Sequence, residues 1–78
     1  MRRLAVESGT IRSIGYDARR RELELEFHES GDVYRYFDVP AGEFAEFMAA
    51  DSKGTYLNQV FKARDHRYLV IRQGRKRK

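Results

Sequence analysis

Four consecutive residues in the second half of the chain carry the groups of a small phosphate-binding corner: Ser52, Lys53, Gly54 and Thr55. They precede an apolar pattern with helical spacing, so they stand where a helix would begin. The free N–H groups of a helix start, two hydroxyls, a glycine and a lysine can together bind a phosphate. The simpler alternative is a capped turn between two helices, with Ser52 as the N-cap.

Basic residues are concentrated at the C-terminal end. Five of the 16 lysines and arginines lie in the last seven positions, and the preceding residues hold 11 basic against 12 acidic side chains. Basic side chains that contact phosphates give sequence-independent, salt-sensitive binding to nucleic acids. A solubilising tail is the alternative. The predicted nucleic-acid contacts are Lys53, Arg64, Arg67, Arg72, Arg75, Lys76, Arg77 and Lys78.

Tyr34 and Tyr36 alternate within a short run that is typical of a β-strand. Alternate aromatic rings on one face of a sheet stack on bases in small RNA-binding domains. In the alternative interpretation they belong to the core beneath a helix, with their hydroxyls at the rim. Strand pairing places both tyrosines on the apolar face, which favours the core.

Other kinds of site have little support. The sequence contains no cysteine, which excludes disulfides and cysteine-ligated metals. His28 and His66 have no partner at metal-ligand spacing, and we expect both to be solvent-exposed. Glu22, Glu24 and Glu26 alternate on an outward face, which predicts a solvated surface and not an acid–base pair. We therefore expect no enzymatic activity, no metal and no cofactor.

The chain is expected to form one small domain. A flexible N-terminal arm is predicted for residues 1–10, a single domain for 11–71 and a disordered basic tail for 72–78. No apolar stretch is long enough to span a membrane, and no signal-like apolar run follows the basic N-terminus. These features predict a cytoplasmic protein that does not associate with membranes.

Alternating apolar residues predict three β-strands, beginning at Ile11, Glu22 and Val33. An even-length loop after Phe27 places the tyrosines inward and Arg35 outward, whereas an odd-length loop would bury the unpaired charge of Arg35. The predicted cross-strand pairs are Tyr16 with Leu23, Ile14 with Leu25, Phe27 with Tyr34, Leu25 with Tyr36, and Glu26 with Arg35.

Helices are predicted after Pro40, which suits the first turn of a helix because it lacks an N–H group. Apolar residues then recur at helical spacing from Ala41 to Ala50, and again from Tyr56 to Phe61. The run Tyr68 to Ile71 is either an edge strand or the end of a helix. The fold class is therefore α+β: a three-stranded antiparallel meander, four-stranded if the last run is extended, followed by two helices on one face.

The order of these features resembles the KTSC domain, a small module found at the C-terminus of some bacterial lysyl-tRNA synthetases and as stand-alone bacterial proteins. The resemblance covers Ser13 to about Lys62. It rests on the following residues: Ser13-Ile14-Gly15-Tyr16-Asp17, Leu23 to Phe27, Tyr34-Arg35-Tyr36, Val39-Pro40, Ala50, Ser52, Lys53, Gly54, Tyr56 and Asn58. It implies a link to RNA through the synthetase, and it does not extend to the basic tail.

Together these patterns predict a small non-catalytic binding module that associates with nucleic acid, most readily RNA, through basic residues of the C-terminal region. The alternative is a protein-interaction or accessory module that binds a partner or a second copy. In that case the contact would be an exposed strand edge or the segment Tyr68 to Ile71.

Overall fold

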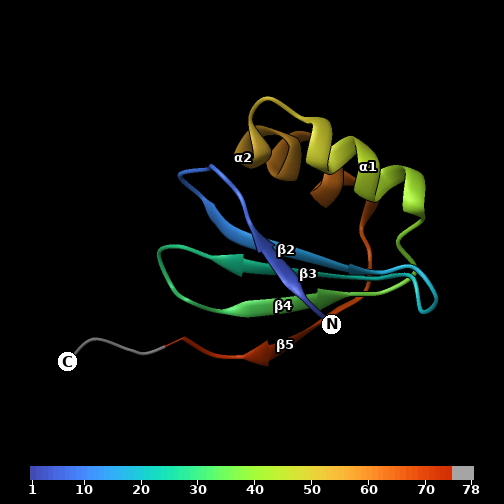
Figure 1. Cartoon of the computed structure of the whole chain (residues 1–78), viewed down its shortest axis with the longest axis horizontal. Helices are drawn as coiled ribbons and strands as arrows, with labels where there is room; N and C mark the ends of the chain where they lie inside the picture. The colour runs from blue at the N-terminus through green and yellow to red at the C-terminus, as the bar shows by residue number, and fades with distance from the viewer. Residues whose placement is uncertain (75–78) are drawn as a thin grey trace.

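The computed structural model describes residues 1–74, which form a five-stranded antiparallel sheet with its strands in chain order (Figure 1). The strands are β1 (Arg3–Ala5), β2 (Ile11–Asp17), β3 (Glu22–Phe27), β4 (Val33–Tyr36) and β5 (Tyr68–Arg72). Between β4 and β5 the chain forms helix α1 (Ala41–Ala49) and a second helical segment made of α2 (Lys53–Tyr56), the π-helical turn η1 (Leu57–Phe61) and the 3₁₀ turn η2 (Lys62–Arg64). The helices lie on one side of the sheet, so the α+β class is as predicted.

The sheet is larger than the predicted three or four strands because both of its edges were underestimated. Strand β1 lies within the segment expected to be a flexible arm, and it pairs with β2 through Leu4 and Ile14. Strand β5 settles the ambiguous run Tyr68 to Ile71 as extended, and it includes Arg72, which was expected to start the disordered tail. None of the helices in residues 1–74 is long and apolar enough to cross a membrane.

The first hairpin has the predicted register, with Tyr16 opposite Leu23 and Ile14 opposite Leu25. The second hairpin has the predicted faces but a register shifted by two residues. Its observed pairs are Leu23 with Tyr36, Glu24 with Arg35, Leu25 with Tyr34, and Glu26 with Val33. The predicted pairing of Arg35 with Glu26 is therefore wrong. The turn closes earlier than expected, because Phe27 N–H donates to the Asp32 carbonyl and Gly31 N–H donates to the Phe27 carbonyl.

The core lies between the inner face of the sheet and the helices. Its fully buried members are Ile11, Ile14, Leu23, Leu25, Val39, Phe47, Leu57 and Phe61, with Tyr36 almost as buried. Alternation along β3 directs Leu23 and Leu25 toward the helices. Phe47 of α1 and Leu57 and Phe61 of η1 lie on the helix faces that pack against the sheet. The predicted N-cap is confirmed, since the Ser52 hydroxyl accepts a hydrogen bond from Thr55 N–H at 3.2 Å.

The outer face of β3 is not the solvated surface that the three alternating glutamates predicted. Glu24 is only 2% exposed, and its carboxylate lies 2.7 Å from Arg3 Nη1 and 2.7 Å from Arg35 Nη2. These two arginines come from β1 and β4, on either side of the β2–β3 hairpin. Two cations compensate the burial of one carboxylate, as a buried charge requires. The ion pairs therefore connect both halves of the sheet on its outer face.

Candidate functional site

The predicted phosphate-binding corner forms the turn between the two helical segments. Lys53 Nζ donates a 2.7 Å hydrogen bond to the Ala50 carbonyl, which follows the last turn of α1. The Ser52 and Thr55 hydroxyls hydrogen-bond to each other at 3.0 Å. Gly54 packs so closely on Thr10 that an added Cβ would lie 2.8 Å from its hydroxyl. These contacts stabilise a capped turn, and phosphate binding at the corner stays a prediction.

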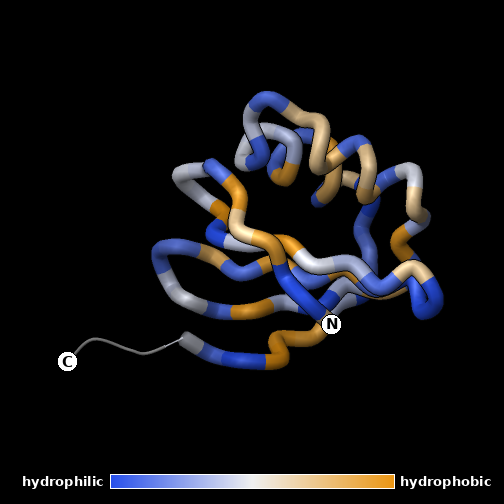
Figure 2. The backbone as a smooth tube through the Cα atoms, in the orientation of Figure 1, coloured by the Kyte–Doolittle hydropathy of each residue, from blue (hydrophilic) through white to orange (hydrophobic). Residues whose placement is uncertain are grey.

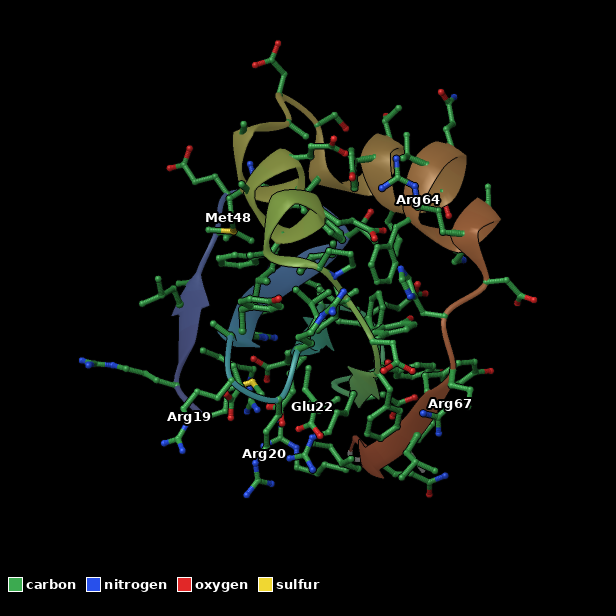
Figure 3. The ribbon with its side chains drawn as sticks, turned by 90° about the vertical axis from the view of Figure 1, so that its right-hand side faces the viewer. Arg19, Arg20, Glu22, Met48, Arg64 and Arg67 are labelled. Carbon is green, nitrogen blue, oxygen red and sulfur yellow. The ribbon has the colours of Figure 1, made fainter. Side chains whose placement is uncertain are left out.

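The predicted basic contacts do not gather on one surface within the described residues. Arg64 lies 3.3 Å from Glu43, whereas Arg67 pairs with Asp38 and has its guanidinium 5.0 Å from the centre of the Phe37 ring. Figure 3 shows Arg64 beside the helices and Arg67 well below it, near β5. Arg72 is at the far end of β5 and bonds to Glu26 at 3.0 Å. Arg75, Lys76, Arg77 and Lys78 lie outside the described residues.

A groove between the sheet and the second helical segment has stronger features of a binding site. We call it the tyrosine groove, and it is made of two adjoining hollows of about 400 and 280 Å³. Both hollows are lined by Tyr34, Tyr36 and Lys62. The wider one continues to Phe27 and the narrower one to Tyr68. The volumes are those of sites for small ligands or for parts of larger ones.

The floor of the tyrosine groove consists of aromatic rings, two of which stack on Tyr34. The Tyr34 and Tyr68 rings have centroids 5.2 Å apart and planes inclined by 21°, and Tyr34 and Tyr36 are 6.1 Å apart and inclined by 26°. Phe27 meets the Tyr34 ring edge-on at 5.3 Å. Strand geometry explains the order: Tyr34 and Tyr36 share a face of β4, and Tyr68 is the cross-strand partner of Tyr36.

The two interpretations of these tyrosines, as core residues or as exposed aromatic rings, each apply to one of them. Tyr36 is 7% exposed and meets the core Phe61 ring edge-on at 4.8 Å, so it is a core residue. Tyr34 is half-buried and lines both hollows. Burial, together with the neighbouring Tyr34 and Tyr68, raises the pKa of Tyr36 to about 12. Its phenol is therefore neutral at physiological pH.

The hydroxyls of Tyr34, Tyr36 and Tyr68 have no hydrogen-bond partner among residues 1–74. No buried side-chain oxygen or nitrogen in that part of the chain lacks a partner, so these hydroxyls reach solvent. A phenol can both donate and accept a hydrogen bond. The groove therefore presents aromatic rings together with polar groups available to a ligand.

The helical wall of the groove adds a cation and a buried histidine. Lys62 is exposed, and no acidic side chain of residues 1–74 lies within ion-pair distance of it. His66 was expected to be solvent-exposed, but its side chain is only 11% exposed, and its Nε2 lies 3.0 Å from a carboxylate oxygen of the buried Glu43. Its ring also packs on Phe61 at 5.0 Å. This contact fixes the start of the segment that leads into β5.

Sequence reasoning did not single out Lys62 and did not connect Tyr68 with Tyr34 and Tyr36. Lys62 follows the buried Phe61 directly, so its exposure could be inferred from the helical pattern. The proximity of Tyr68 depends on β5 pairing with β4 across the whole helical region, and no local pattern reports that pairing.

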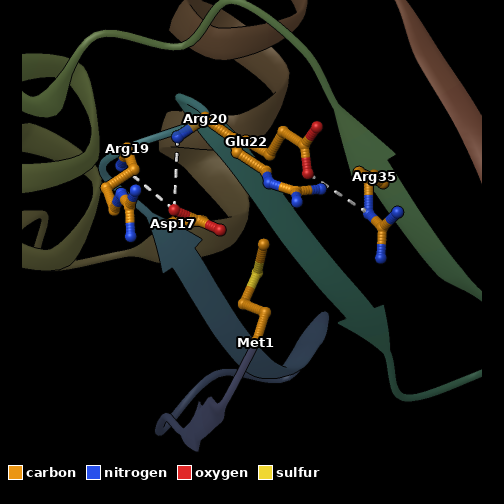
Figure 4. Close-up of a pocket in the computed structure, with 6 residues that line it drawn as sticks. All are labelled: Met1, Asp17, Arg19, Arg20, Glu22 and Arg35. Atoms are coloured by element: carbon orange, nitrogen blue, oxygen red, sulfur yellow. Dashed lines mark hydrogen bonds and ion pairs between the residues drawn. The ribbon is translucent and has the colours of Figure 1, made fainter.

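Another hollow, separate from the tyrosine groove and at the opposite end of the β2–β3 hairpin, is lined by charged side chains (Figure 4). Its lining includes Arg19, Arg20 and Arg35, but also Asp17 and Glu22. Asp17 accepts hydrogen bonds from the backbone N–H groups of Arg19 and Arg20, so it orders the turn. Acidic residues line both this hollow and the tyrosine groove, but among the described residues this hollow has no aromatic lining on which a base could stack.

Comparison with known proteins identifies the family. Residues 7–66 match the model of the KTSC domain. The chain belongs to the KTSC domain family. A KTSC domain protein from Yersinia pestis with a crystal structure has 39% identity and a TM-score of 0.84, covering 91% of this chain and 97% of that chain.

Two other relatives show the contexts in which this domain occurs. An uncharacterized protein from Stutzerimonas stutzeri is 46% identical over 71 residues, which cover 91% of this chain and 99% of the relative. A lysine–tRNA ligase from Nostoc punctiforme is 34% identical over 61 residues, which cover 78% of this chain but only 11% of the ligase. The KTSC domain therefore occurs as almost an entire chain and as a small part of a synthetase.

The KTSC match contains most of the tyrosine groove, including Phe27, Tyr34, Tyr36 and Lys62, and ends at His66. Strand β5 lies beyond it. The β4 floor and the helical wall of the groove are thus part of the family domain, whereas Tyr68 and the predicted C-terminal basic contacts lie outside the matched region.

Proposed function

We propose that this KTSC domain is a non-catalytic module that binds single-stranded RNA in the tyrosine groove. The observation that carries the proposal is the aromatic floor of the groove, in which the half-buried Tyr34 ring stacks on the rings of Tyr36 and Tyr68, with the exposed Lys62 in the lining of both hollows. Bases stack on aromatic side chains with a gain of about 1 to 3 kcal/mol per base, and a nearby lysine contacts the phosphates.

The family context favours RNA as the nucleic acid. A lysine–tRNA ligase, by its name, acts on a tRNA, and it carries a segment similar to this chain. Glu29, Asp32 and Asp65 also line the two hollows, so Lys62 supplies the attraction for a phosphate there. The tyrosine hydroxyls can hydrogen-bond to base edges or to the 2′-hydroxyl of a ribose. The C-terminal basic residues would add affinity that depends on salt concentration.

The test is binding of fluorescent single-stranded RNA and of tRNA, measured by anisotropy at low and moderate salt. We expect Lys62→Glu to weaken binding by about tenfold or more, because it reverses a positive charge in the lining of both hollows. Arg19→Glu is the matched control: it makes the same change in net charge at an exposed position in the other hollow. It should weaken binding much less.

Two further variants separate stacking from charge. Tyr34→Leu should weaken binding by roughly 1 to 3 kcal/mol, and Tyr34→Phe, which keeps the ring, should retain most of the affinity. A chain ending at Gly74 should still bind, with a smaller salt dependence. The proposal fails if no form binds at low salt, or if Lys62→Glu and Arg19→Glu weaken binding equally.

The alternative function, a protein-interaction module, is favoured by a different observation. Strand β5 exposes four consecutive apolar residues at an open edge of the sheet. This edge shares Tyr68 with the tyrosine groove, whereas Leu69, Val70 and Ile71 do not line it.

A further inference from the structure

The two edges of the sheet are protected to different degrees. Strand β1 is only three residues long and begins with an arginine, both of which discourage pairing with another chain. Strand β5 is longer and exposes Tyr68 by 53%, Leu69 by 59%, Val70 by 41% and Ile71 by 38%. Figure 2 shows most of this stretch in orange along the open side of the sheet. A strand of this kind pairs readily with another strand.

Backbone geometry identifies which groups of β5 are available. Phe37 N–H donates to the Arg67 carbonyl at 2.9 Å, so the backbone polar groups of Arg67 point toward β4. In an antiparallel ladder these groups alternate in direction along the strand. Those of Leu69 therefore also point toward β4, whereas the N–H and C=O groups of Tyr68 and Val70 point outward from the open edge.

These directions fit a second copy of the same strand in one register. If two β5 strands run antiparallel with Leu69 opposite Leu69, Tyr68 of each copy lies opposite Val70 of the other. Every outward N–H and C=O of Tyr68 and Val70 then has a partner. Leu69 meets its counterpart in the closer, non-hydrogen-bonded type of pair, where side chains contact most tightly.

Neighbouring registers fit less well. Centring the pair on Val70 would place Tyr68 opposite Arg72, and β5 is irregular between Val70 and Arg72, where its register to β4 shifts. Such an irregularity takes the following residues out of phase with a partner strand. The register centred on Leu69 uses only the regular part of β5. In this register the paired residues are Tyr68, Leu69 and Val70, so no two basic side chains face each other.

We propose that the chain forms a two-fold symmetric dimer through β5, in which the two sheets join edge to edge. The interface is isologous, because each copy supplies the same residues. Residues opposite each other share a face, so both tyrosine grooves open on the same side of the joined sheet. The interface is short, and we expect a weak, reversible dimer of the size class of transient contacts. The proposal does not depend on RNA binding.

The decisive experiment is sedimentation equilibrium from about 10 μM to about 1 mM protein, a range that detects weak association. The unmodified chain should change from monomer to dimer. Leu69→Lys should remain monomeric, because it opposes two ammonium groups across the two-fold axis. Leu4→Lys is the matched control: Leu4 is 54% exposed on the other edge strand, and its replacement should leave the dimer intact.

Charge complementation distinguishes loss of the interface from loss of the fold. Leu69→Lys and Leu69→Glu should each be monomeric alone and should form a heterodimer when mixed, because the new side chains face each other. In the unmodified chain, hydrogen exchange of the Tyr68 and Val70 amides should slow as concentration rises, whereas the Leu4 amide should not respond.

Several results would overturn the dimer. These are a monomer throughout the concentration range, a dimer unaffected by Leu69→Lys, a dimer disrupted by Leu4→Lys, or failure of the two Leu69 variants to associate. Association of the chain only with other proteins would also reject self-pairing, and it would indicate a different occupant of the same edge.

Discussion

A single hydroxyl sets the ionisation of one carboxylate on the outer face of the sheet. Ser13 is 7% exposed, and its hydroxyl donates a 2.8 Å hydrogen bond to Glu26. This bond is the largest influence that lowers the pKa of Glu26; desolvation opposes it, and the charges of Arg3 and Arg72 reinforce it. Because the pKa is lower in the folded state, the contribution to stability is present above the ordinary value of about 4.3. It is lost as pH falls through the folded pKa.

Ser13→Ala should therefore lower the free energy of unfolding by about 1.5 to 3 kcal/mol at pH 7, the usual range for a hydrogen bond to a charged group. The penalty should be smaller at pH 3 than at pH 7, because pH 3 lies below the ordinary pKa of a glutamate and a larger share of Glu26 is protonated there. Urea denaturation at both pH values measures it, and an NMR titration should show the Glu26 pKa moving upward. In a Glu26→Gln background the pH dependence should vanish. An equal penalty at pH 7 and pH 3 would contradict this account.

The residue-level predictions from sequence were correct about faces and about the partners in the first hairpin, and wrong about the partners in the second. Alternation assigns Arg35 and the glutamates to the outer face, because side chains alternate strictly along a strand. Alternation does not distinguish which of the three glutamates pairs with Arg35. Because the turn closes at Phe27, the cross-strand partner of Arg35 is Glu24 and not Glu26. Glu43 and His66 lie 23 positions apart, and only the folded chain brings them together.

At the scale of the secondary-structure elements, Gly15 explains why β1 can form. A Cβ at this position of β2 would lie 2.8 Å from the Arg2 carbonyl oxygen and 2.9 Å from Arg3 Cγ. A glycine inside a strand often marks such a close approach of another segment. This is the sequence signal for β1 that strand periodicity did not provide.

Gly15→Ala should therefore weaken the pairing of β1 with β2 and leave the β2–β3 hairpin in place. The clash is with backbone, which cannot rotate away as a side chain can. Hydrogen exchange of the amides in residues 3–5 should become markedly faster, and the free energy of unfolding should fall by roughly 1 to 3 kcal/mol. Gly42→Ala is the control, because nothing lies within 4 Å of a Cβ at that helical position. Unchanged exchange in β1 would contradict the role given to Gly15.

Elements with local signals were predicted well, and elements defined by distant partners were not. The β2–β3 hairpin, α1 and the Ser52 cap each follow from spacing or from a capping residue within a few positions. Strand β1 is too short to show a period, and four apolar residues in β5 suit either a strand or a helix. Their conformations are decided by the neighbouring strands, β2 and β4.

At the scale of the whole molecule, the α+β layers were predictable because one face of each element is apolar and must be covered. The position of the tyrosine groove was not, because it depends on where the helices end relative to β4 and β5. The groove is the part of the inner face between the second helical segment and the last two strands. The resemblance to the KTSC domain drew attention to Tyr34 and Tyr36, but it did not predict how far each side chain is exposed.

The order of the strands also has a kinetic consequence. Strands β1 to β4 pair with their sequence neighbours through short connections, whereas β4 and β5 are separated by all the helical residues. Closing a long segment costs more chain entropy than closing a short one, so the β4–β5 pairing is expected to form late in folding. Tyr68→Ala should then speed unfolding and leave the folding rate almost unchanged. Ile14→Val, in the β2–β3 hairpin, should slow folding.

Stopped-flow denaturation at protein concentrations too low for association measures both rates. Equal effects of the two substitutions on folding would indicate that β5 is already paired in the transition state. If β5 docks last, the tyrosine groove is the last part of the molecule to be completed during folding and the first to be lost during unfolding. Its lifetime would then be set by the opening of a single strand.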